Sequence, residues 1–242
     1  MFLTPSNGPE GWRALLADPE KHWRTGYSSK ALAYCWEEAR GFPKSVSETF
    51  QRFGSPLRQT QFLLGIPEHK VPMPPVGGRP SQNDLFVLAR TDGRIAAAGD
   101  GGPPGGSNPG LVAIMVEGKV SEPFDRLVSE WKQIEASPGK GERLQFLCRL
   151  LDVNKAAVDG IRYQLLHRTA SALIEAQRFC AMQTLMLVHS FSQSYEHFDD
   201  YAAFVQLFCG AAQQDAVVHV GRRGGVELYL GWVRGEAEYL TR

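Results

Sequence analysis

The run of apolar residues from Leu111 to Val116 constrains the fold more than any other segment, because three polar or small residues, Glu117, Gly118 and Lys119, follow it at once. A short, continuous apolar run of this kind is typical of a strand buried in a sheet. The segment DLFVLAR, which begins with Asp84, has the same character. Charges that adjoin buried strands are costly unless they are paired or bind something. We therefore expect a covered sheet with a polar site at the strand ends.

Helix-like and strand-like segments surround these two strands. A helix is predicted over Ser28–Arg40, with Ser28 or Ser29 as its N-cap, and a strand over 61–66 is expected to end at Pro67. The other predicted elements are helices over 45–53, 124–134, 142–153, 159–179 and 197–211, a strand over 184–192, and a hairpin over 215–235 that turns at 222–225. This order predicts a mixed α/β domain with a sheet flanked by helices.

The length of 242 residues suits a single domain, with a core over about 28–191 and a C-terminal helix and hairpin over about 197–235. The stretch 91–110 is rich in glycine and proline, which predicts a long flexible loop. It lacks the lysine and the following helix of a phosphate-binding loop, so nucleotide binding there is not expected.

Charge and apolar content limit the possible partners. Lys+Arg and Asp+Glu both number 26, so nucleic-acid binding would require a local basic patch. The four cysteines are far apart and are predicted to be buried free thiols. The N-terminus lacks the pattern of a signal peptide, and no apolar run is long enough for a membrane span. We expect a cytoplasmic protein that has no membrane partner.

The charged strand ends predict a metal site. Side chains two apart on a strand share a face, so Glu117 and Lys119 point the same way. If the two strands are neighbours, Asp84 lies beside Glu117, and two close carboxylates repel unless a cation or proton lies between them. Magnesium, or manganese in its place, suits such a pair. Lys119 would then orient or deprotonate the attacking water, or stabilise charge on a phosphate.

With these residues the chain resembles the PD-(D/E)xK, or restriction-endonuclease-like, nuclease superfamily over about residues 28–191. The whole chain also resembles an uncharacterised bacterial domain family grouped with this fold. The resemblance implies an αβββαβ core in which Asp84, Glu117 and Lys119 are catalytic and the two carboxylates bind the metal. It further implies a carboxylate on the first core helix, either Glu37 or Glu38. Glu37 is favoured because it is nearer the apolar side of the helix.

The resemblance also implies polar substrate-binding residues on the helix after the third core strand. Gln164, His167 and Arg168 have the spacing that places them on one helix face. A dyad of His189 and Ser190 is the competing hydrolase hypothesis, but adjacent strand residues face opposite ways, which makes its geometry poor.

Two functional hypotheses follow. The first is a magnesium-dependent nuclease, with DNA or RNA as substrate. The second is a regulatory or protein-interaction module on the same fold, which the zero net charge favours. The hairpin over 217–233 could offer an edge strand for a homodimer.

Overall fold

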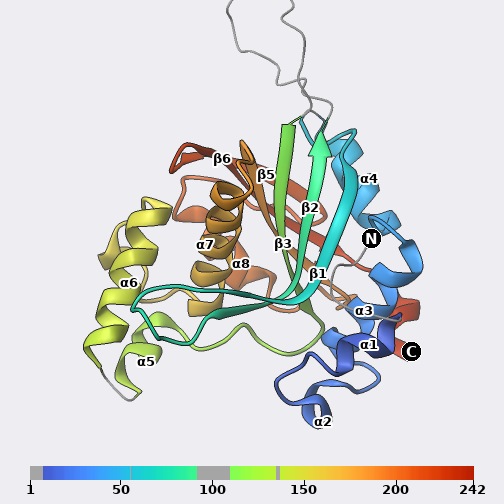
Figure 1. Cartoon of the computed structure of the whole chain (residues 1–242), viewed down its shortest axis with the longest axis horizontal. Coiled ribbons are helices and arrows are strands. Elements are labelled where there is room, and N and C mark those ends of the chain that lie inside the picture. The colour runs from blue at the N-terminus through green and yellow to red at the C-terminus, as the bar shows by residue number, and fades with distance from the viewer. Residues whose placement is uncertain (1–7, 55, 92–109, 135–136) are drawn as a thin grey trace, which may run out of the picture.

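The computed structural model describes residues 8–54, 56–91, 110–134 and 137–242 and has a mixed α/β architecture. Its centre is a six-stranded sheet in the order β1-β2-β3-β4-β6-β5, with helices on both faces (Figure 1). The sheet is mixed: β3 and β4 are parallel, β4 and β6 are parallel, and the other neighbours are antiparallel. The mixed α/β fold predicted from the sequence is thus confirmed.

The strands follow the predicted order along the chain. Their bounds are β1 Gln61–Val71, β2 Ser81–Thr91, β3 Gly110–Lys119, β4 Gln183–Ser190, β5 Ala216–Arg223 and β6 Val226–Arg234. The predicted C-terminal hairpin is confirmed as β5 and β6, which turn at Gly224 and Gly225. Both of these glycines have positive φ, which a tight hairpin turn requires.

The helices lie before the sheet segments and between them. Their bounds are α1 Pro9–Arg13, α2 Pro19–His22, α3 Ser28–Ala39, α4 Lys44–Phe53, α5 Val128–Gln133, α6 Pro138–Leu151, α7 Tyr163–Arg178 and α8 Phe198–Gln206, with short 3-10 turns at Lys155–Ala157 and Ala237–Thr241. The first two helices and both 3-10 turns are too short to produce an apolar periodicity, so the sequence did not predict them.

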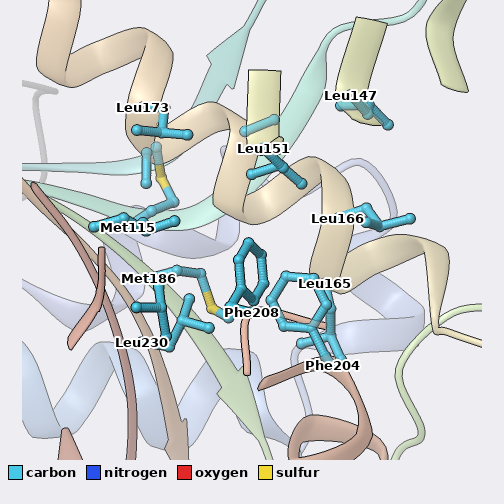
Figure 2. Packing of buried hydrophobic residues seen from close by; sticks show 14 of the residues in the cluster. Met115, Leu147, Leu151, Leu165, Leu166, Leu173, Met186, Phe204, Phe208 and Leu230 are labelled. Atoms are coloured by element: carbon cyan, nitrogen blue, oxygen red, sulfur yellow. The ribbon is translucent and has the colours of Figure 1, made fainter. Parts of the chain in front are cut away.

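Each face of the sheet has its own apolar core, and the alternation of side chains along the strands assigns residues to them. Met115 belongs to the same core as Leu165 and Leu173 of α7 on one face, and Figure 2 shows residues of this core from close by. Ile114, the preceding residue, packs on the other face with Leu32 of α3. Burial on both faces explains why the run from Leu111 to Val116 is continuously apolar.

Several predicted boundaries are wrong; the helix predicted over 197–211, for example, ends at Gln206. The first strand continues through Pro67 to Val71, because β1 is an edge strand, where a residue without an N–H group is tolerated. Tyr27, not Ser28 or Ser29, is the N-cap of α3, since its backbone is extended and Ser28 is already helical. Of the predicted loop 91–110, Thr91 and Gly110 are strand ends, and residues 92–109 lie outside the described residues.

Candidate functional site

A cleft of about 710 Å³ opens where β1, β2 and β3 bring polar residues together. The walls come from these strands, from the start of α7, and from the segments around α2 and α3. The polar residues that it collects from the sheet and α7 are Glu68, Gln82, Asp84, Glu117, Lys119, Gln164 and Arg168. Strands β2 and β3 are hydrogen-bonded neighbours in a register that pairs Leu85 with Val116, which brings Asp84 to Glu117 as predicted.

Glu117 is the centre of this group, and its side chain is only 3% exposed. Its Oε1 accepts hydrogen bonds from Lys119 Nζ at 2.8 Å and from Gln164 Nε2 at 2.6 Å. Its Oε2 accepts one from Arg168 Nε. Lys119 Nζ also donates to Gln164 Oε1 at 3.2 Å and lies 4.9 Å from the ring centroid of Phe124. Glu117 and Lys119 therefore point to the same face, towards α7.

Asp84 lies beside Glu117, and its two carboxylate oxygens have different partners. Its Oδ2 accepts a hydrogen bond from the Gly118 backbone N–H at 2.8 Å. Its Oδ1 lies 3.8 Å from Arg168 Nη2, and no described residue donates a hydrogen bond to this oxygen. The backbone of β3 thus fixes one oxygen of Asp84, and the other oxygen faces the guanidinium group of Arg168.

Glu68 is a third carboxylate that the sequence analysis did not predict. It lies on β1 between the register pairs Pro67–Leu85 and His69–Asn83, and so opposite Asp84 on the neighbouring strand. Gln82 Nε2 donates to its Oε2 at 2.6 Å. A φ of 51° places Glu68 in the left-handed region, which is unusual for a non-glycine residue and occurs mainly at sites under local constraint. Because the sequence predicts that this strand ends at Pro67, it does not predict that Glu68 belongs to the site.

The three carboxyl groups differ in their electrostatics. Burial, and then the charge of Glu117, raise the pKa of Asp84 to about 7. Burial and the charge of Asp84 raise the pKa of Glu68 to about 8. Burial also acts to raise the pKa of Glu117, but Arg168 and Lys119 overcome it and hold this pKa below its usual value. Glu117 is therefore an anion between two cations, while Asp84 and Glu68 titrate near neutrality.

The residues predicted on α7 divide between two places. Gln164 and Arg168 contact Glu117, so they belong to the centre of the site. His167 faces a neighbouring hollow instead, where its Nδ1 lies 2.8 Å from Ser81 Oγ. Burial, and then Arg168, hold the pKa of His167 well below its usual value, so its ring is neutral. We call Glu68, Asp84, Glu117, Lys119, Gln164 and Arg168 the Glu117 cluster.

The structure does not bring Glu37 to the Glu117 cluster. Its Oε1 accepts a hydrogen bond from Trp12 Nε1 at 2.8 Å, and it does not line the cleft. Glu38 is exposed and forms an ion pair with Arg242. The helix that carries them, α3, packs on the sheet face opposite α7. The helical spacing identified the inner side of α3, but it could not tell which face of the sheet this helix covers.

A second polar cluster surrounds His189 on the α3 face; it comprises Cys35, Trp36, Ser45, His189 and Glu236, and we call it the His189 cluster. Ligand atoms of Cys35, His189 and Glu236 lie within 4.8 Å of one another. However, His189 Nδ1 accepts a hydrogen bond from Trp36 Nε1 at 3.1 Å. The neutral ring therefore carries its proton on Nε2, the nitrogen that faces Ser45, so this nitrogen has no lone pair for a metal. The hydrogen bond from Trp36 therefore indicates a structural role for His189.

Comparison with known proteins identifies a family. A model described as a domain of unknown function (DUF6946) matches residues 5–99 and 105–237, so the chain belongs to this family. Neither the curated proteins nor the solved structures contain a match to the chain. Among the described residues, no helix combines the length and the apolar character that crossing a membrane requires.

Proposed function

We propose that this chain is a divalent-metal-dependent nuclease that hydrolyses phosphodiester bonds in DNA or RNA. The observation that carries the proposal is the convergence of Glu68, Asp84, Glu117 and Lys119 from three adjacent strands into one cleft. With α4, α5 and α6 set aside as additional helices, the order α3, β1, β2, β3, α7, β4 matches the αβββαβ order of the PD-(D/E)xK fold and supports the resemblance.

The donor set fits a hard divalent cation. Magnesium and manganese prefer carboxylate oxygens, and each of the three carboxylates keeps an oxygen with acceptor capacity to spare. In the described part of the chain, Asp84 Oδ1 and Glu68 Oε1 accept no hydrogen bond, and Glu117 Oε2 accepts only the one from Arg168. The mutual repulsion that contributes to the raised pKa values of Asp84 and Glu68 is what a cation would relieve. Asp84 and Glu117 would hold the metal directly. Glu68, whose oxygens do not form a close three-ligand group with theirs among the described residues, would act on it through a coordinated water.

The remaining residues of the Glu117 cluster have separate tasks. A bound metal would supply a coordinated water of lowered pKa and would offset charge on the phosphate. Lys119, whose amine is fixed by Glu117 and Gln164, would donate a hydrogen bond to a phosphate oxygen or to the attacking water. Arg168 is a positioning residue, because it fixes the orientation of Glu117 from α7.

The test is a cleavage assay with labelled DNA and RNA in Mg²⁺ or Mn²⁺. Asp84→Asn and Lys119→Met should each lower the rate by at least about a hundredfold. Asp199→Asn and Lys155→Met are matched controls, because both residues are exposed, form no ion pair within the described chain and lie outside the cleft. If the Asp84 and Lys119 variants cleave at the rate of the unaltered protein, the assignment is wrong.

One observation favours a non-catalytic module as the second candidate. Arg168 and Lys119 already balance Glu117 without any ligand, so the cluster can serve as an internal ion-pair network. Thermal unfolding separates the two candidates, because a metal that binds only the folded chain raises the melting temperature. A rise in millimolar Mn²⁺ that disappears in Asp84→Asn supports the nuclease. No rise, together with no cleavage, supports the module.

A further inference from the structure

A second hollow, of about 660 Å³, adjoins the cleft, and we call it the basic groove. Its walls come from the β1–β2 connection, from α5 and α6, and from the start of α7. In Figure 1 the β1–β2 connection reaches across to α6, and this crossing forms one side of the groove. Four cationic residues line it: Arg79, Arg126, Lys140 and Arg143.

The charges of these four residues are not balanced by an ion pair with any described residue. In the parts that the structure describes, none of the four forms an ion pair, although Asp125 is also in the groove wall. Lys140 donates instead to the carbonyl groups of Trp131 and Ile134. Arg143 donates to the carbonyl of Pro74 at 2.8 Å. Because carbonyl groups fix a cation without neutralising it, the groove keeps a positive field in a chain whose net charge is zero.

The groove and the cleft are continuous. Gln82, Asp125 and Arg126 line both hollows, so a ligand can extend from one into the other. Arg79 and Arg126 are exposed, and no described residue accepts a hydrogen bond from their side chains. These two guanidinium groups are therefore available to an anion, and guanidinium is well suited to phosphate because its donors match two oxygens at once.

The aromatic residues of the groove are already engaged. Trp131 and Tyr163 stack with their ring centroids 3.9 Å apart and their planes at 11°. Lys140 Nζ lies 5.1 Å from the centroid of the Trp131 ring. The groove therefore offers positive charge in place of a free stacking surface for bases. This combination favours contact with a backbone over recognition of sequence.

We infer that the basic groove binds the phosphate backbone of the nucleic acid that flanks the bond to be cleaved. The inference rests on the proposed function, because the cleft would hold the reacting phosphate and the groove its neighbours along the strand. It also meets the requirement of a local basic patch in a neutral chain. Because phosphate contacts are indifferent to base identity, the groove would bind nucleic acids of different sequences alike.

The experiment measures binding without cleavage. Fluorescence anisotropy would follow a short fluorescein-labelled DNA duplex, and the matching single strands of DNA and RNA, in EDTA at increasing salt. The double variant Arg79→Ala/Arg126→Ala should bind about tenfold or more weakly at about 0.1 M salt, and its salt slope on the duplex should fall by roughly 2. The control Arg58→Ala/Arg149→Ala removes two exposed arginines outside both hollows and should bind like the unaltered protein.

The inference is overturned if the unaltered protein does not bind any of these probes, or if the groove variant keeps the affinity and salt slope of the control. It is also overturned if heparin, a polyanion that is not a nucleic acid, binds more tightly than every probe. Failure of the two proposals would look different. Cleavage that survives in the groove variant with unchanged KM contradicts the groove alone, whereas groove-dependent binding without cleavage in Mg²⁺ or Mn²⁺ contradicts the nuclease alone.

Discussion

The two buried polar clusters lie at the same end of the central strands, yet they differ in almost every physical respect. The register pairs Gly118 with His189 and Lys119 with Ser190, and the side chains of the two clusters project to opposite faces of the sheet. The Glu117 cluster is charged, borders a cleft and contains carboxyl groups that titrate near neutrality. The His189 cluster is centred on a neutral, fully buried imidazole.

The difference shows how one sheet carries both a charged polar cluster beside a cleft and a buried cluster with a neutral centre. Charge is tolerated around Glu117 because Arg168 and Lys119 compensate it directly and because the cleft admits solvent and ligands. His189 has no such compensation, and burial lowers its pKa to about 3, so the ring stays uncharged. The two groups of polar residues at this end of the sheet therefore differ in whether the central side chain keeps its charge.

The largest expected effect comes from removing the positioning cation of the Glu117 cluster. Arg168→Met leaves Glu117 buried with Lys119 as its remaining cation, and the free energy of unfolding should fall by about 3–5 kcal/mol. Urea denaturation measures this loss. Because the cost arises from an uncompensated charge, adding Glu117→Gln to this variant should recover part of it. A double variant less stable than Arg168→Met would contradict the account.

The next effect is a dependence of stability on pH from Asp84 and Glu68. Their pKa values in the folded chain, about 7 and about 8, exceed the usual 3.8 and 4.5, so the folded state binds more protons between these limits. The free energy of unfolding should therefore fall as pH rises through this window, by several kcal/mol, because each pKa unit corresponds to about 1.4 kcal/mol. Asp84→Asn should flatten the slope in denaturation curves taken from about pH 5 to about pH 8 without metal. An unchanged slope would mean that Asp84 is ionised throughout.

The His189 cluster should respond to pH with the opposite sign. The pKa of His189 falls from 6.5 to about 3 on folding, so the unfolded chain binds more protons between these values. Stability contributed by His189 is present above pH 6.5 and is lost as the pH falls below it, by on the order of 1 kcal/mol at about pH 5. His189→Gln should reduce this acid loss in the same measurement. His167 has the same sign and should leave part of the acid loss in place.

The smallest expected effect is that of Glu37→Gln, which tests the remaining carboxylate of the sequence hypothesis. The glutamine can still accept a hydrogen bond from Trp12, so the free energy of unfolding should change by less than about 1 kcal/mol. The cleavage rate should stay within about twofold of the unaltered protein, since Glu37 does not line the cleft. A drop comparable with that of Asp84→Asn would place Glu37 in the reaction after all.

Periodicity and apolar runs were sufficient to predict the mixed α/β fold, the C-terminal hairpin and the proximity of Asp84 to Glu117. These features depend on local alternation and on two strands being neighbours, and both leave a signal in the sequence. The position of Glu68 depends on a strand that continues past Pro67, which local rules treat as an end. The location of Glu37 depends on which face of the sheet α3 covers, and no pattern within a single helix contains that information.

Arg168 illustrates a further gap between pattern and structure. Its spacing from Gln164 correctly predicted a shared helix face, and the resemblance assigned that face to the substrate. In the structure Arg168 bonds to Glu117 and approaches Asp84, so it already neutralises the site from within. Whether a helical cation meets a ligand or a carboxylate of its own chain depends on how far the helix lies from the sheet, which only tertiary packing determines.

Gly118 sets a limit on how this protein can diverge. A Cβ at this position would lie 3.3 Å from Leu32 Cδ2 and 3.4 Å from Asp84 Oδ2, so helix α3 and the cleft share one narrow backbone position. Relatives without the proposed chemistry would be free to vary Asp84 and Glu68 but would still have the close approach of Leu32 at position 118. Relatives that vary at all three positions would therefore have adjusted the contact between α3 and the sheet, whereas relatives that vary only at the two carboxylates would lack these groups of the proposed metal site and keep this contact.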